Sequence, residues 1–279
     1  METVELTIAG AAGPASERIS VVVLGASNVS RGMARLAATV RGRSPLPVDL
    51  FVAAGHGRSY GVNSRVWMRR LPSILGSGLW RGLDRERITP ARAGLQPGKL
   101  VGLLTDVGND LLYGFSPEQV AGWVREAVGR LTDRGASLAI ARLPLEAIRL
   151  VGPVRYRVLR TLLVPKCPLT LAGVHAATAD LDGRLGEMAT SLGLATIHQP
   201  AEWYGLDTLH PRRRRLDTLW HLVCDAWGMP PAVRPTAARV RDWSVLGSRA
   251  AEVRMLAGRM RFTPQPVHIF PDGSRVALY

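Results

Sequence analysis

Residues 19–28 read ISVVVLGASN, and this stretch decides the fold. A run of β-branched and apolar residues is typical of a buried strand, and the small residues after it predict a turn into a helix. In a parallel α/β sheet, such a turn presents its side chains to a crevice at the carboxyl edge of the sheet. Ser27 is therefore expected at this edge, where it is either a helix cap or a reactive hydroxyl.

Strand and helix patterns alternate along the chain that follows. Further strands are predicted over 49–54, 100–105, 137–143 and 194–197. Helices are predicted over 31–41, 116–134, 171–192 and 216–227, with a broken helical pattern over 62–80. This alternation favours a flavodoxin-like, doubly wound three-layer α/β/α sandwich with a mainly parallel five-stranded sheet. The long connections at 55–98 and 144–170 are typical of functional loops.

The composition divides the 279 residues into three parts. Residues 1–18 form an N-terminal lead, residues 19–230 form the α/β domain, and residues 231–279 form a C-terminal extension that starts in a proline-rich stretch. Within the extension we expect a basic helix over 249–261 and a hairpin over 267–279. The extension is expected to pack on the core or on a partner.

The chain is strongly basic, with a formal net charge of +14 that comes almost entirely from arginine. Such a charge raises the possibility of binding to nucleic acid or to an anionic membrane. The arginines are scattered along amphipathic segments, however, and no nucleic-acid-reading motif accompanies them. We therefore interpret them as solvated faces and expect no specific nucleic-acid partner.

Targeting and cofactor signals are weak throughout. No apolar run reaches the roughly 18 residues of a membrane span, and residues 1–14 do not resemble a signal peptide. The two cysteines, Cys167 and Cys224, give neither a disulfide framework nor a metal-binding spacing. These patterns predict a cytoplasmic protein with buried thiols, no metal and no cofactor.

Four polar elements follow the predicted strands. Ser27 follows the first, Gly55 the second and Asn109 the third, while Asp207 and His210 follow the last. Each could be a cap or a turn former on its own, but parallel strands bring their carboxyl ends to one edge. Together they supply a hydroxyl, two candidate oxyanion donors and a carboxylate–imidazole pair, which are the parts of an acyl-transfer site.

These motifs resemble the SGNH, or GDSL-type, hydrolase family. The matching residues are Gly25-Ala26-Ser27, Gly55, Gly108-Asn109-Asp110 and Asp207-Thr208-Leu209-His210, in the family's order across 19–228. The sequence departs from the family at two positions: Ala26 stands where the family has Asp, and Val107 stands where its GxND motif has the first Gly.

The resemblance implies an esterase. Ser27 would be the nucleophile and His210 the base, oriented by Asp207. The backbone N–H groups of Ser27 and Gly55 and the side chain of Asn109 would form the oxyanion hole. The implied reaction is metal-independent hydrolysis of a small-molecule carboxylic ester through an acyl-enzyme.

Two other functions remain open at this point. One is an acyltransferase that uses the same site with an alcohol in place of water, and the other is an inactive binding module with a basic surface. Several residues near the motifs are candidates for a substrate pocket, although each could equally be exposed or a core anchor: His56, Tyr60, Tyr113, Trp203 and Tyr204.

Overall fold

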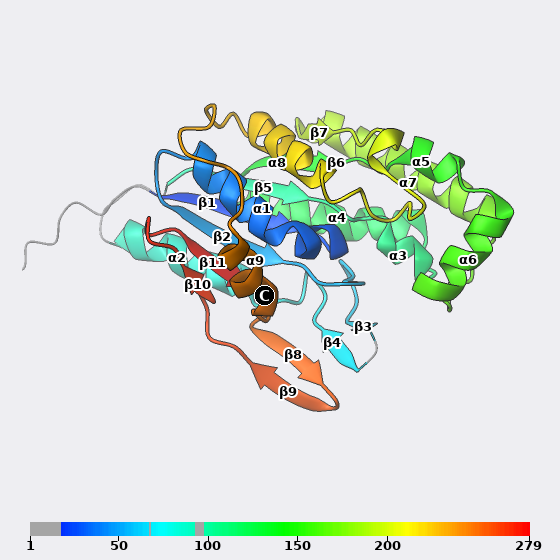
Figure 1. The fold of residues 1–279 in the computed structure, drawn as a ribbon, viewed down its shortest axis with the longest axis horizontal. Coiled ribbons are helices and arrows are strands. Elements are labelled where there is room, and N and C mark those ends of the chain that lie inside the picture. The colour runs from blue at the N-terminus through cyan, green and yellow to red at the C-terminus, as the bar shows by residue number, and fades with distance from the viewer. Residues whose placement is uncertain (1–17, 67, 93–97) are drawn as a thin grey trace, which may run out of the picture.

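The computed structural model describes residues 18–279, except residue 67 and residues 93–97. Within this part of the chain a seven-stranded sheet forms the centre of the molecule, in the order β10-β11-β2-β1-β5-β6-β7 (Figure 1). Its parallel strands are β1 (Ile19–Leu24), β2 (Val48–Ala53), β5 (Leu100–Leu104), β6 (Ser137–Ala141), β7 (Ala195–Ile197) and β11 (Arg275–Leu278). The run β2-β1-β5-β6-β7 has the flavodoxin-like order, so the predicted fold class is confirmed.

The sheet has two more strands than predicted. The hairpin expected over 267–279 is present as β10 (His268–Ile269) and β11, but β11 pairs in parallel with β2 and so joins the main sheet. The C-terminal extension thus packs on the core. The sequence could not show this, because the partner strand lies more than two hundred residues away and neither strand carries a pairing signal.

Helices cover both faces of the sheet. One face carries α1 (Ser27–Arg43), α8 (Arg215–Ala226) and α9 (Val240–Ser248), and the other carries α2 (Leu79–Arg92), α4 (Pro117–Thr132) and α7 (Leu171–Leu192). Alternate residues of β1 serve the two cores: Val21 and Val23 pack with the first group, and Val22 and Leu24 with the second. Because β1 is buried on both faces, it reads as a continuous apolar run.

Shorter elements lie around the carboxyl edge of the sheet. They are α3 (Asn109–Leu112), α5 (Leu145–Arg149), α6 (Pro153–Leu163) and the 3₁₀ turn η1 (Ala201–Trp203). A small antiparallel sheet projects below the main body in Figure 1, in the order β3-β4-β8-β9. Its strands are β3 (Ser64–Val66), β4 (Arg69–Leu71), β8 (Val253–Leu256) and β9 (Arg259–Phe262).

Two predicted helices are wrong, and both fall in this small sheet. The pattern over 62–80 forms β3 and β4 with loops, and α2 begins only at Leu79. The basic segment 249–261 forms β8 and part of β9, closed by a turn in which Gly258 has φ +77°. Short segments with alternating arginine and apolar residues fit the period of a helix as well as the period of a strand. Here the pairing between the strands of the small sheet stabilises the strand conformation.

A buried carboxylate ties the last strand to the rest of the fold. Asp49 on β2 accepts two hydrogen bonds from Arg275 on β11 and two from Arg18. Burial by itself raises the pKa of Asp49, but the hydrogen bonds from the two guanidinium groups outweigh it and lower the pKa. The position of β11 beside β2 is thereby fixed by charge as well as by backbone pairing.

Candidate active site

Ser27, His210 and Asp207 form a continuous hydrogen-bonded chain. His210 Nε2 lies 2.8 Å from Ser27 Oγ, and His210 Nδ1 lies 2.5 Å from Asp207 Oδ2. The other carboxylate oxygen of Asp207 accepts the N–H of Leu209 at 2.9 Å. Burial raises the pKa of Asp207, but the bonds to His210 and Leu209 and the positive charge of Arg31 bring it below its usual value. The carboxylate therefore stays ionised beside the imidazole.

The turn that carries Ser27 requires a glycine before it. A Cβ on Gly25 would lie 2.6 Å from the Val29 side chain and 2.8 Å from that of Thr105. Ser27 then opens α1, and the N–H groups in the first turn of a helix have no partner within that helix. The turn thus presents a hydroxyl and an available N–H at the carboxyl end of β1.

Asp106 holds this turn, and sequence reasoning missed it. Its carboxylate accepts the N–H of Ala26 at 2.8 Å and the N–H of Asn28 at 3.0 Å, on either side of Ser27. Asp106 has φ +58°, a left-handed conformation that costs a non-glycine residue about 1–3 kcal/mol. The residues on both sides of Ser27 are therefore fixed by a carboxylate from the end of β5, at the turn where Ala26 itself carries none.

Asn28 connects the turn to the loop of the imidazole. Its Nδ2 donates to Asp106 Oδ1 at 2.7 Å and to the carbonyl of Leu209 at 3.3 Å. The loop itself is closed by an antiparallel bridge between Tyr204 and Pro211. The distance between Ser27 and His210 is thus set by a bonded framework that runs through Asn28.

The two predicted oxyanion donors lie on either side of Ser27. Gly55 follows β2 and Asn109 follows β5, and these strands are the two neighbours of β1. Asp110, beside Asn109, accepts the N–H of Tyr60 at 3.0 Å and so connects α3 to the loop after Gly55. Burial raises the pKa of Asp110 to about 6, although hydrogen bonds from Ser59 and Tyr60 act in the opposite direction. This braced turn is the support that an amide needs to act as a rigid donor.

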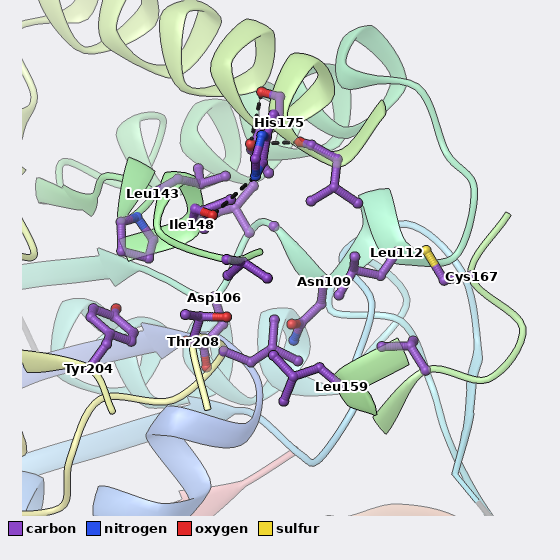
Figure 2. Close-up of a pocket in the computed structure, with 18 of the residues that line it drawn as sticks. Asp106, Asn109, Leu112, Leu143, Ile148, Leu159, Cys167, His175, Tyr204 and Thr208 are labelled. Carbon is purple, nitrogen blue, oxygen red and sulfur yellow. Dashed lines mark hydrogen bonds between the residues drawn. The ribbon is translucent and has the colours of Figure 1, made fainter. Parts of the chain in front are cut away.

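A largely apolar cavity of about 120 Å³ lies next to this site (Figure 2). Asn109 and Asp106 border it on the side of the site, and side chains from α5, α6 and α7 form its other walls. An apolar cavity of about 150 Å³ stays dry and binds benzene, so this one has room for a group of roughly six carbons. Its apolar walls are Leu143, Ile148, Val151, Leu159, Val164, Leu171 and Val174.

The five candidate pocket residues lie in different places. Tyr204 lines the cavity. Tyr60 and Trp203 are buried in the core, so for these two the alternative of a core anchor applies. Tyr113 lies at the end of α3 and donates its hydroxyl to the carbonyl of Gly57. His56 lies on the exposed loop after β2, where the desolvation of its ring and the nearby positive charges of Arg31 and Arg69 lower its pKa.

The described part of the chain has no cluster of metal-binding side chains. Within it, no group of three or more His, Cys, Asp or Glu side chains could hold a metal ion. No helix in the same part of the chain is long and apolar enough to cross a membrane. Cys167 and Cys224 are free and buried. The cytoplasmic location stays a prediction.

The chain is similar to several solved structures at low sequence identity. No protein-family model and no curated protein matches the chain. Among solved structures, it is similar to the esterase EstA from a Pseudoalteromonas species, with 13% identity over 74% of this chain and 93% of that chain and a TM-score of 0.41. It is also similar to TesA, with 15% identity over 74% of this chain and 97% of that chain and a TM-score of 0.44.

A third similar structure is a member of the lipolytic protein G-D-S-L family from Veillonella parvula DSM 2008. Its identity is 13% over 73% of this chain and 96% of that chain, with a TM-score of 0.41. This is the family that the four motifs of the sequence resemble. The identities and TM-scores are low, so evidence for an activity comes from the side chains of this chain alone.

Proposed function

We propose that the chain is a metal-independent serine hydrolase that cleaves small carboxylic esters through an acyl-enzyme. The observation that carries this proposal is the chain of short contacts from Ser27 through His210 to Asp207. A hydroxyl within 2.8 Å of an imidazole nitrogen, with a carboxylate on the other nitrogen, is the arrangement that activates a serine.

In the first half of the reaction, Ser27 Oγ attacks the carbonyl carbon of the ester while His210 Nε2 takes its proton. Asp207 holds the imidazole in the required orientation and stabilises its charged form. The tetrahedral intermediate collapses when the bond to the alcohol breaks, and His210 returns the proton to that alcohol. In the second half, His210 takes a proton from a water, which attacks the carbonyl carbon of the acyl-enzyme. When the bond to Ser27 Oγ then breaks, His210 returns the proton to Ser27 and the acid is released.

The negative charge of the intermediate requires donors aimed at the former carbonyl oxygen. The N–H of Ser27, the N–H of Gly55 and the Nδ2 of Asn109 come from the ends of three adjacent strands, which supports a shared target. The apolar cavity beyond Asn109 would take an uncharged part of the ester, because its walls offer few polar partners.

Labelling with a fluorophosphonate probe tests the proposal directly. The purified protein should react with the probe and should hydrolyse p-nitrophenyl butyrate in the presence of EDTA. Only an activated serine attacks the phosphorus centre at a useful rate, so a binding module would stay unlabelled. A folded protein that neither labels nor turns over any p-nitrophenyl ester would overturn the proposal.

Asn109→Ala should lower kcat by about 10²–10³ with little change in KM, the range expected for one lost oxyanion donor. The amide contact strengthens only as charge develops on the oxygen, so it acts on the transition state more than on binding. Asn109→Asp should be at least as harmful, because it places a carboxylate beside the forming oxyanion.

Steady-state kinetics and the melting temperature of both variants together show whether Asn109 is an oxyanion donor or a structural residue of its turn. If Asn109 only shapes its turn, both variants will lose melting temperature while their folded fraction keeps a near-normal kcat. That outcome would remove Asn109 from the proposed oxyanion hole.

A further inference from the structure

The outer face of α6 carries a row of exposed apolar side chains. Val154, Val158 and Leu162 are 76%, 52% and 73% exposed, and their spacing of four residues places them on one face of the helix. No residue of α6 is buried. In Figure 1 the helix lies at the right-hand margin of the molecule.

The opposite face of α6 already has a role. Tyr156 and Leu159 line the cavity beside the candidate active site, and the Tyr156 hydroxyl donates to the carbonyl of Leu169. Arg155 Nε donates to the carbonyl of Leu206, the residue before Asp207. The helix is thus held to the cavity and to the Asp207 loop from its inner side, and these contacts leave the outer row exposed.

Neighbouring residues extend the exposed apolar surface. Leu150 precedes α6 and is 70% exposed, and Leu206, bonded to Arg155, is 85% exposed. Single exposed apolar residues are ordinary in a folded protein, but several gathered on one side mark a surface that contacts a partner. We call the three α6 residues Val154, Val158 and Leu162 the outer row.

In the stretch of chain that contains the outer row, every charged side chain is positive. Between Glu146 and Asp180 the chain contains no acidic residue. The same stretch contains five basic residues, namely Arg149, Arg155, Arg157, Arg160 and Lys166. An apolar row flanked by arginine is the pattern of a helix that lies in the interface of an anionic membrane.

Other partners fit this surface less well. A nucleic acid would neutralise the arginines but offers nothing to cover Val158 and Leu162. A second copy of the chain would bring together two molecules that each carry a net charge of +14.

We propose that the outer row of α6 docks on an anionic lipid surface, which would place the cavity and Ser27 on the inner side of the docked helix. Docking is a binding property that goes beyond ester hydrolysis and does not need the Ser27 hydroxyl.

Vesicle sedimentation tests this with the full chain. We expect the protein to sediment with phosphatidylcholine vesicles that contain an equal share of phosphatidylglycerol, and to be released from them by added salt. Vesicles of phosphatidylcholine alone should bind it at least roughly tenfold more weakly, because the arginines then lose their counter-charge. Ser27→Ala should sediment like the wild type, which separates this proposal from the proposed chemistry.

The variant V158D/L162D should reduce binding to the anionic vesicles by roughly tenfold or more, since it places carboxylates where the apolar face enters the interface. The matched control is M260D/F262D on β9, where the two side chains are 57% and 71% exposed in another arginine-rich setting. This control should bind like the wild type. All these residues lie outside the site, so both double variants should keep the turnover of soluble p-nitrophenyl butyrate.

A charge variant gives an independent reading. Arg157→Gln should weaken binding to the anionic vesicles about fivefold, as expected for one cation near the surface. Arg125→Gln on α4, also exposed, should have little effect.

Four results would overturn the proposal. They are a wild type that does not sediment with the anionic vesicles, equal binding by V158D/L162D, loss of binding in M260D/F262D alone, and a wild-type dimer that V158D/L162D dissociates. The last would mean that a second copy covers the outer row.

Discussion

Ser27→Ala should abolish fluorophosphonate labelling and lower the kcat of ester hydrolysis by about 10⁶, the loss found when a catalytic serine is removed from such a triad. The substitution deletes the atom that forms the acyl-enzyme, and no other hydroxyl lies in hydrogen-bonding contact with His210 among the described residues. Because one small oxygen is lost, the melting temperature should change little.

Ser30→Ala is the matched control. Ser30 lies one turn further along α1, and its hydroxyl donates to the carbonyl of Ala26 at 3.1 Å. It therefore shares the helix and the turn with Ser27 but has no contact with His210. The control should keep both labelling and turnover. If Ser27→Ala retained p-nitrophenyl butyrate hydrolysis at the wild-type rate, Ser27 would not be the nucleophile.

The proximity of Ser27 and His210 could be predicted because the topology of a parallel sheet determines which residues lie close together. In a parallel sheet every strand ends at the same edge, so polar residues after several strands are brought together whatever the details of their turns. The short apolar strand over 19–24 is unambiguous because it is buried on both faces. Locating these strand ends in the sequence was therefore enough to gather Ser27, Gly55, Asn109 and the pair Asp207/His210 at one edge.

Asp106 and Asn28 could not be predicted in the same way. Asp106 accepts hydrogen bonds from the backbone N–H groups of Ala26 and Asn28, which lie 80 and 78 residues away in the sequence. Asn28 donates to the carbonyl of Leu209, which lies 181 residues away. A short polar residue at a strand-to-helix junction is also the ordinary choice for a cap. The left-handed conformation of Asp106 is a property of the folded chain. The one available sequence signal was that Asp106 directly follows the strand over 100–105.

The strands of the small sheet were predicted as helices for a different reason. Strand β4 pairs with β8, and the paired residues Arg70 and Met255 are separated by most of the chain. Alternating arginine and methionine satisfies the period of a strand and also leaves enough apolar residues for one side of a helix. Where the local sequence favours helix and strand equally, pairing with distant strands determines which of the two forms, and a single sequence does not show that pairing.

His210→Ala should lower kcat by about 10⁴–10⁶, because Ser27 then has no group to take its proton and the leaving alcohol has none to return it. The imidazole is held at 2.8 Å from Ser27 Oγ and 2.5 Å from Asp207 Oδ2, so its removal breaks the hydrogen-bonded chain between the hydroxyl and the carboxylate. Fluorophosphonate labelling should fall by a similar factor, since it depends on the same activated oxygen.

His221→Ala is the control that separates a base from a structural histidine. Both histidines follow an Asp-Thr-Leu sequence, but His221 lies within α8, where the pattern falls on an ordinary helix. We expect near wild-type kcat for His221→Ala. Equal losses of kcat in the two variants, at equal melting temperature, would contradict the role of His210. A large loss of kcat in His210→Ala with none in His221→Ala would localise the base to the loop that the Tyr204–Pro211 bridge closes. Among the described residues, only that loop places an imidazole between a carboxylate and Ser27.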